Sequence, residues 1–130
     1  MSSSNNAKTL VIDDSAPMRK AIIEALRAIP GCEVVGEGKN GLEALELARA
    51  HCPDLIVMDI HMPVMGGFEA LRLLKRELPC IQVVLVSTAV EPEIRALALN
   101  VGATACLQKG PEMFGEFKLL VAQLTKISQA

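Results

Sequence analysis

Charged and hydroxyl side chains stand at or just after the ends of four short apolar runs. They are Asp13 and Asp14 after the first run, Asp59 after the third, Ser87 and Thr88 at the fourth, and Lys109 after the fifth. Three carboxylates in one crevice repel one another, so a shared proton or a bound cation must offset their charge. Oxygen ligands without His or Cys favour a hard ion, above all Mg²⁺ with a substrate phosphate. A carboxylate beside such an ion can accept a phosphoryl group, whose oxygens a lysine and a hydroxyl would stabilise.

The apolar runs that precede these residues alternate with helical periodicities. The runs cover 10–12, 34–35, 55–58, 83–86 and 105–107, and each is too short to be a helix. The helical stripes between them are Met18, Ile22, Leu26 and Ile29; Leu42, Leu45 and Ala48; Phe68, Leu71, Leu74 and Leu78; Ile94, Leu97, Ala98 and Val101; and Phe117, Leu120, Val121 and Leu124. Alternating strands and helices predict an α/β fold, a (βα)5 open parallel sheet with helices on both faces. Its ligand site should lie at the carboxyl ends of the strands.

Each polar residue taken alone also has an ordinary structural explanation. Asp13 to Ser15 could cap a helix, Asp59 could belong to a turn, and Ser87 could cap a loop. Lys109 could be a solvated surface charge. Their common placement at strand ends of one sheet favours a shared site over four separate explanations.

Composition restricts the class of protein. The 130 residues are 51% hydrophobic, carry a net charge of −2 and include three aromatic residues, all Phe. These values exclude a disordered chain and a base-stacking surface, and they argue against direct binding of nucleic acid. Charged residues interrupt every long apolar stretch, so no membrane span is expected.

The N-terminus is Ser/Asn-rich and has no apolar core of a signal peptide. We therefore expect a cytoplasmic protein with a disordered lead-in over 1–7, one domain over 8–127 and a tail over 128–130. The four cysteines, Cys32, Cys52, Cys80 and Cys106, form no C-x-x-C pair. They are expected to be reduced and mostly buried.

The motifs together resemble the receiver domains of two-component response regulators, including the chemotaxis regulators. The matching segments are Val11–Ser15 with Met18 and Arg19, Asp59–Pro63 with Gly66 and Gly67, Ser87–Thr88, and Lys109. The resemblance runs from about residue 8 to residue 127. It implies a flavodoxin-like fold with strand order 2-1-3-4-5. It also implies a phosphoprotein of a phosphorelay, carrying an aspartyl phosphate.

The resemblance further implies a role for each site residue. Asp59 would be the phosphoacceptor, Ser87 the switch hydroxyl, and Lys109 the partner of the phosphoryl group. Asp14, Asp59 and the backbone carbonyl of His61 would hold Mg²⁺, with Asp13 reaching the ion through water.

The implied partners are proteins. The phosphodonor would be a sensor histidine kinase or a phosphotransfer domain. A downstream protein would bind the face formed by the fourth helix, the fifth strand and the fifth helix. The chain would be a phosphoacceptor and not an enzyme in its own right, although it could be the receiver part of a larger output enzyme.

Three positions depart from the family pattern. The usual aromatic switch residue is Cys106, Gly110 separates Lys109 from Pro111, and Thr88 replaces the usual small residue after the switch hydroxyl. The first departure bears on how activation is relayed, and none touches the acceptor.

Two alternatives remain open from the sequence. A corrinoid-binding module binds cobalt through the histidine of Asp-x-His-x-x-Gly, which Asp59 and His61 match in part. Val64, however, stands where that glycine is required. A phosphorylation-independent pseudo-receiver is the second alternative, although all five site residues of the family are retained.

Overall fold

The computed structural model describes residues 6–129 of the chain, with side chains as far as Thr125. Strands and helices alternate as the sequence predicts: β1 Ala7–Ile12, α1 Ala16–Arg27, β2 Cys32–Gly38, α2 Gly41–His51, β3 Leu55–Asp59, α3 Gly67–Glu77, β4 Gln82–Ser87, α4 Pro92–Val101, β5 Ala105–Gln108 and α5 Pro111–Gln129. The strands form one parallel sheet in the order β2-β1-β3-β4-β5, which confirms the predicted fold.

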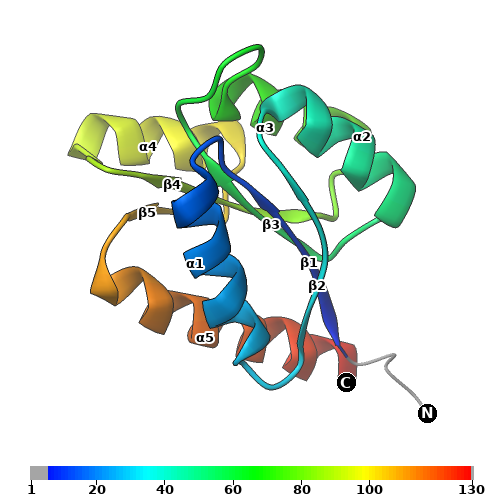
Figure 1. The fold of residues 1–130 in the computed structure, drawn as a ribbon. Coiled ribbons are helices and arrows are strands. Elements are labelled where there is room, and N and C mark those ends of the chain that lie inside the picture. Colours follow the sequence, from blue (N-terminus) through cyan, green and yellow to red (C-terminus); the bar gives the residue numbers. More distant parts are fainter. Residues whose placement is uncertain (1–5, 130) are drawn as a thin grey trace.

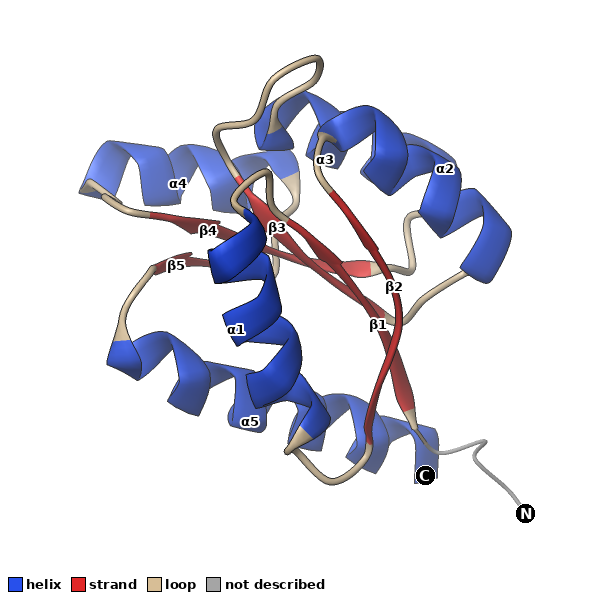
Figure 2. Cartoon of the chain, viewed as in Figure 1, coloured by secondary structure: helices blue, strands red, loops and turns tan. Residues whose placement is uncertain are grey.

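Helices cover both faces of the sheet (Figures 1 and 2). Helices α1 and α5 lie on one face, and α2, α3 and α4 lie on the other. Successive residues of the central strands point alternately to the two faces, which divides the core into two clusters. Ile56 and Met58 of β3 belong to the cluster under α2, α3 and α4, whereas Leu55 and Val57 belong to the one under α1 and α5. Both faces of β3 are therefore buried, which explains why its sequence does not alternate between apolar and polar residues.

Local signals set where the helices start and stop. The Ser15 hydroxyl accepts the Met18 N–H at 3.4 Å, and the Asn40 side chain accepts the Glu43 N–H at 2.9 Å, so each caps a helix. Helix α4 starts at Pro92, whose missing N–H costs nothing in a first turn. It stops at Gly102, which has φ 124°.

The ends of the domain differ slightly from the expected limits. Strand β1 begins at Ala7, whose N–H donates to the Gly31 carbonyl at 2.6 Å, so Ala7 does not belong to a lead-in. Helix α5 continues to Gln129, beyond the expected limit of 127. The expected lead-in residues 1–5 and residue 130 lie outside the described part of the chain. Among the described helices, none has the length and apolar character needed to cross a bilayer.

The expectation that the cysteines are mostly buried is wrong for two of them. Cys106 is buried in β5 and Cys32 is half-buried, but Cys52 and Cys80 are exposed. The exposed pair lies outside the regular elements, at the end of α2 and in the turn before β4, where solvent reaches the side chains.

Candidate functional site

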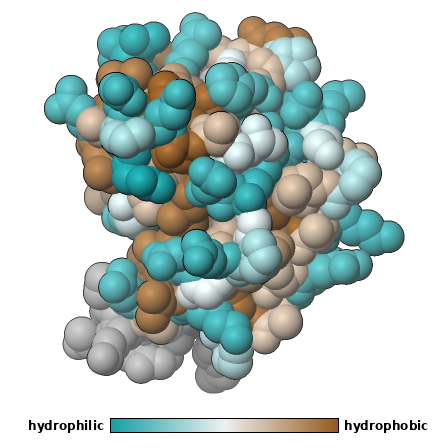
Figure 3. Space-filling model, turned by 90° about the vertical axis from the view of Figure 1, so that its left-hand side faces the viewer, coloured by the Kyte–Doolittle hydropathy of each residue, from teal (hydrophilic) through white to brown (hydrophobic). Residues whose placement is uncertain are grey.

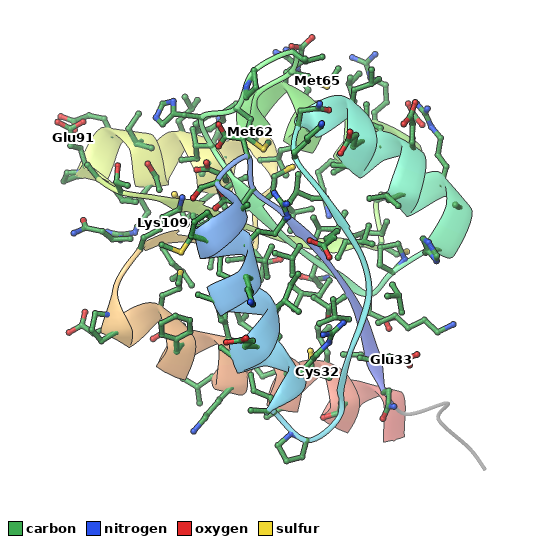
Figure 4. All side chains as sticks on the ribbon, in the orientation of Figure 1. Cys32, Glu33, Met62, Met65, Glu91 and Lys109 are labelled. Carbon is green, nitrogen blue, oxygen red and sulfur yellow. The ribbon has the colours of Figure 1, made fainter. Side chains whose placement is uncertain are left out.

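The carboxyl edge of the sheet brings the predicted site residues together. Asp59 ends β3, Ser87 ends β4, Asp13 follows β1, and Lys109 follows β5. Figure 4 shows Lys109 toward the same end of the sheet as Met62 and Met65 of the β3–α3 loop. Cys32 and Glu33, at the start of β2, lie at the other end. The parallel topology thus delivers polar side chains from four strands to one crevice.

The loop after β1 is held by a short network. Asp13 is fully buried, and its Oδ1 accepts the Ser15 N–H at 2.9 Å. Arg19 donates from Nη1 to the Asp13 carbonyl at 2.6 Å and from Nε to Glu37 Oε1 of β2 at 2.8 Å. Arg19 therefore ties the Asp13 backbone to the neighbouring strand. The sequence motif contained Arg19 but did not predict this contact.

Asp59 is held from both sides by backbone contacts. The next residue, Ile60, donates its N–H to the Val86 carbonyl of β4 at 3.0 Å and accepts the Gly67 N–H at 2.8 Å. A Cβ on Gly67 would lie 2.9 Å from the Ile60 Cα and still closer to the Asp59 carbonyl. The start of α3 can therefore press against the end of β3 only with glycine at 67.

Lys109 enters the crevice from the opposite side. Its N–H donates to the Ser87 carbonyl at 2.8 Å, which extends the pairing of β4 and β5 by one residue. Its Nζ lies 3.0 Å from Asp13 Oδ2 and 3.6 Å from Asp59 Oδ1, and its side chain is 10% exposed. One ammonium group thus faces two buried carboxylates.

The pKa of Asp59 is raised above its ordinary value, chiefly because burial disfavours the carboxylate. The negative charge of Asp13, and more weakly that of Asp14, raises it further. The Lys109 ammonium and the backbone N–H of His61, which donates to the Asp59 carboxylate, oppose the rise. The site therefore disfavours the negative charge on Asp59, and an additional cation would stabilise that charge.

The acidic residues fit a small hard cation. One carboxylate oxygen from each of Asp13, Asp14 and Asp59 lies within 4.8 Å of the other two. Asp13 Oδ2 is buried and accepts no hydrogen bond, although Lys109 Nζ lies 3.0 Å away as an ion pair. Mg²⁺ prefers oxygen ligands, and Asp13 Oδ2 is a carboxylate oxygen that no hydrogen bond satisfies.

A hollow of ≈ 530 Å³ opens beside the acidic cluster, between the β3–α3 loop and the start of α4. Ser87 is buried at 2% exposure on its wall, whereas Thr88 and His61 are exposed. Cys106 lies elsewhere, in the core beneath α4, and is 2% exposed. The predicted site residues thus meet at one edge of the sheet. The position that the family usually fills with an aromatic switch residue holds the small, buried side chain of Cys106.

Comparison with known proteins gives a consistent family match. The model of the family described as response regulator receiver domain matches residues 9–116. The chain is 48% identical over 109 residues to protein-glutamate methylesterase/protein-glutamine glutaminase 4 of Myxococcus xanthus, covering 81% of this chain and 31% of that protein. The chain therefore spans about a third of the length of this relative.

Solved structures show the same fold. The response regulator domain of Thermotoga maritima CheB superposes with a TM-score of 0.79 at 34% identity, covering 96% of this chain and 98% of that one. A two-component response regulator of the LuxR family from Aurantimonas superposes with a TM-score of 0.85 at 25% identity, covering 93% of this chain and 86% of that one. Both are described as response regulators.

Proposed function

The chain belongs to the response regulator receiver domain family, and on this premise we propose that it accepts a phosphoryl group on Asp59 in a Mg²⁺-dependent reaction. One observation carries the proposal. Asp59 ends the central strand with Lys109 Nζ at 3.6 Å and with the carboxylates of Asp13 and Asp14 beside it. An acceptor carboxylate, a lysine and an acidic cation site are the parts that phosphoryl transfer to aspartate requires.

The donor in this proposal is the phosphohistidine of a sensor histidine kinase or of a phosphotransfer domain. A carboxylate oxygen of Asp59 attacks phosphorus, the P–N bond breaks, and its electron pair stays with the imidazole. A P–O bond to Asp59 replaces it. Burial favours the protonated acid, whereas the ionised form attacks, so Lys109 serves the reaction by favouring the anion.

The cation would be held by Asp14, by Asp59 and by the backbone carbonyl of His61, with Asp13 acting through water. When bound, Mg²⁺ supplies positive charge that neutralises the phosphoryl oxygens during transfer. Lys109 would then contact the phosphoryl group, and the Ser87 hydroxyl would donate to one of its oxygens. Asp13 would keep its ion pair with Lys109 and so orient the ammonium group.

Downstream partners are proposed to bind the face formed by α4, β5 and α5. Residues of all three elements line a hollow of ≈ 210 Å³ there: Arg95, Leu107, Gln108, Glu112, Met113 and Glu116. On the side of the molecule that carries α4, apolar patches alternate with polar groups (Figure 3). Leu99 of α4, one turn after Arg95, is about half exposed, at 48%. Mixed apolar and charged surfaces of this kind are typical of transient interfaces.

The proposal is tested by chemical phosphorylation. Wild type, Asp59→Asn and Asp54→Asn are incubated with acetyl phosphate and Mg²⁺, and their intact masses are measured. Asp54 is an exposed aspartate at the other end of β3, so its variant controls for the loss of an acidic residue. We expect one phosphoryl group on wild type and on Asp54→Asn, and none on Asp59→Asn. Equal labelling of all three proteins would overturn the assignment.

A further inference from the structure

Two exposed thiols share a hollow at the sheet edge opposite the acidic site. Cys52 ends α2 in the left-handed conformation with φ 46°, and Cys80 lies in the turn between α3 and β4. Both line a hollow of ≈ 350 Å³ at the amino ends of β3 and β4. Nothing in the proposed phosphoryl transfer uses either side chain.

Strand pairing holds the two cysteines together on one side. The Gln82 N–H donates to the Asp54 carbonyl at 3.0 Å, and the parallel register pairs Leu55 with Gln82. Cys52 lies two residues before Asp54, and Cys80 lies two residues before Gln82. The segments that carry the two cysteines therefore enter the sheet next to each other and run in the same direction. Neighbouring parallel strands are about 4.7–4.9 Å apart.

A salt bridge holds the same segments on the other side. Arg49 of α2 binds Glu77 of α3 through two parallel hydrogen bonds, Nε to Oε1 and Nη2 to Oε2, both at 2.9 Å. Arg49 lies three residues before Cys52, and Glu77 three residues before Cys80. An exposed pair adds little to stability, but its forked geometry defines how the two helix ends face each other. Each cysteine thus lies on a short segment anchored to the other segment at both ends.

The surroundings favour a bond between the sulfurs over a metal site. The Asp54 carboxylate accepts the Lys8 N–H at 2.9 Å, and the Glu77 carboxylate is engaged by Arg49. Within residues 6–125, the acidic cluster of Asp13, Asp14 and Asp59 is the one group of three or more potential metal ligands. Two thiols without further ligands suit disulfide chemistry better than a tetrahedral cation.

We propose that Cys52 and Cys80 form a reversible intramolecular disulfide when the protein meets hydrogen peroxide. One thiol gives up its proton and its sulfur attacks a peroxide oxygen; the O–O bond breaks, a sulfenic acid forms, and the departing hydroxide takes the proton and leaves as water. The second sulfur then attacks the sulfenic sulfur, the S–O bond breaks, the S–S bond forms, and a second water leaves. The two thiols lose two electrons in total, and the peroxide gains them. A dithiol reductant reverses the reaction by exchange.

This pair is a modification site independent of the proposed phosphoryl transfer. The bridge would join the ends of α2 and α3 at the amino edge of the sheet. Asp59 lies at the carboxyl edge of the same strand. Oxidation should therefore leave phosphorylation by acetyl phosphate within about twofold of the reduced protein.

The test is peroxide treatment of the folded chain, followed by alkylation of the remaining thiols, trypsin digestion and mass spectrometry. We expect wild type to lose about 2 Da and to keep two of its four alkylatable thiols. The tryptic peptides 50–72 and 77–95 should appear cross-linked, at least about tenfold more abundantly than any other pair. Dithiothreitol should restore all four thiols.

Variants in which one cysteine is replaced provide the control. Cys52→Ser and Cys80→Ser should each abolish the cross-linked pair, whereas Cys32→Ser, which removes a half-buried thiol, should retain it. Four alkylatable thiols after oxidation, a bridge to Cys32 or Cys106, or bridges only between two molecules would each overturn the proposal.

Discussion

At the scale of single residues, the site is an unbalanced cluster of charge. Asp13 and Asp59 face one ammonium group, and the carboxylate of Asp14 lies beside them. The pKa of Asp59 is raised by burial and by the neighbouring carboxylates. The sequence was sufficient to predict which residues gather, because strand ends of a parallel sheet share an edge. It could not predict that Lys109 lies closer to Asp13 than to Asp59, at 3.0 against 3.6 Å, since rotamers depend on packing across strands.

The raised pKa predicts how Asp59 affects stability. A carboxyl with a higher pKa in the folded than in the unfolded protein binds more protons when folded, so its contribution is favourable at low pH and is lost as the pH rises through the folded pKa. Asp59→Asn should therefore melt at a higher temperature than wild type at pH 7 without Mg²⁺.

The pH dependence separates this effect from a general gain in stability. The difference in Tm should shrink as the pH falls below about 4, where the unfolded carboxyl is also protonated. Thermal unfolding of both proteins between pH 3 and pH 8 measures it. A variant that melts lower than wild type at pH 7 would show that the Asp59 carboxylate is favourably solvated in the fold.

At the scale of elements, the chain positions Asp59 by pressing α3 against the end of β3. The sequence predicted β3 from a short apolar run and α3 from its helical periodicity. The close approach at Gly67 and the Arg19 contact to the Asp13 carbonyl were not predictable, because both depend on the path of the loop that joins each strand to the helix after it. Capping was easier to predict, since Ser15 acts on the N–H of its own helix three residues later.

Two glycine substitutions test this packing. Gly67→Ala places a Cβ against the Asp59 and Ile60 backbone, so it should destabilise the fold by about 1–3 kcal/mol and slow phosphorylation. Gly115→Ala on the exposed face of α5 meets nothing within 4 Å and should stabilise by about 0.5–1 kcal/mol. Urea titration gives both free energies of unfolding. If the two variants behave alike, packing at Gly67 does not position Asp59.

Helix α4 is the element best suited to move. Within the described chain, Ala98 is its one fully buried side chain, and a hollow lies beneath its first turns. Cys106, below the helix, is too small to present or withdraw a large surface. A signal should therefore travel through the loop after Ser87 and through a shift of α4, driven by differential contacts with the phosphoryl group.

Beryllofluoride, which mimics the phosphoryl group, tests this route. Its largest amide chemical-shift changes should fall in residues 87–101, with little change around Cys106. Cys106→Ala should keep most of the response, and Ser87→Ala should lose most of it. The opposite pattern, a response lost with Cys106→Ala and kept with Ser87→Ala, would reject this account of the switch.

At the scale of the whole molecule, two dry clusters stabilise a sheet whose carboxyl edge carries uncompensated negative charge. The number and order of elements followed from the sequence pattern, whereas the strand order 2-1-3-4-5 came only from the family resemblance. Periodicity indicates which residues face a core but not which strand lies next to which. Periodicity also does not indicate how exposed a residue is at the end of an element. Cys52 and Cys80 were therefore wrongly expected to be buried.

The charged edge predicts that a divalent cation stabilises the whole fold. Magnesium at about tenfold its Kd should raise the free energy of unfolding by roughly 1–2 kcal/mol, because it binds only the folded chain. Asp14→Ala should respond much less, and Glu24→Ala, an exposed acidic residue of α1, should respond like wild type. Without metal, Asp14→Ala should melt no lower than wild type, since the substitution relieves repulsion. A lower Tm would contradict the repulsion argument.

The most direct test of the central claim identifies the residue that carries the phosphoryl group. Wild type is phosphorylated with acetyl phosphate and Mg²⁺, reduced with borohydride to convert any aspartyl phosphate to homoserine, digested with trypsin and sequenced by mass spectrometry. Peptide 50–72 contains both Asp54 and Asp59, so fragmentation within it distinguishes the two. The account predicts homoserine at position 59 alone, dependent on Mg²⁺. Homoserine at position 13, 14 or 54 with Asp59 unmodified would contradict it.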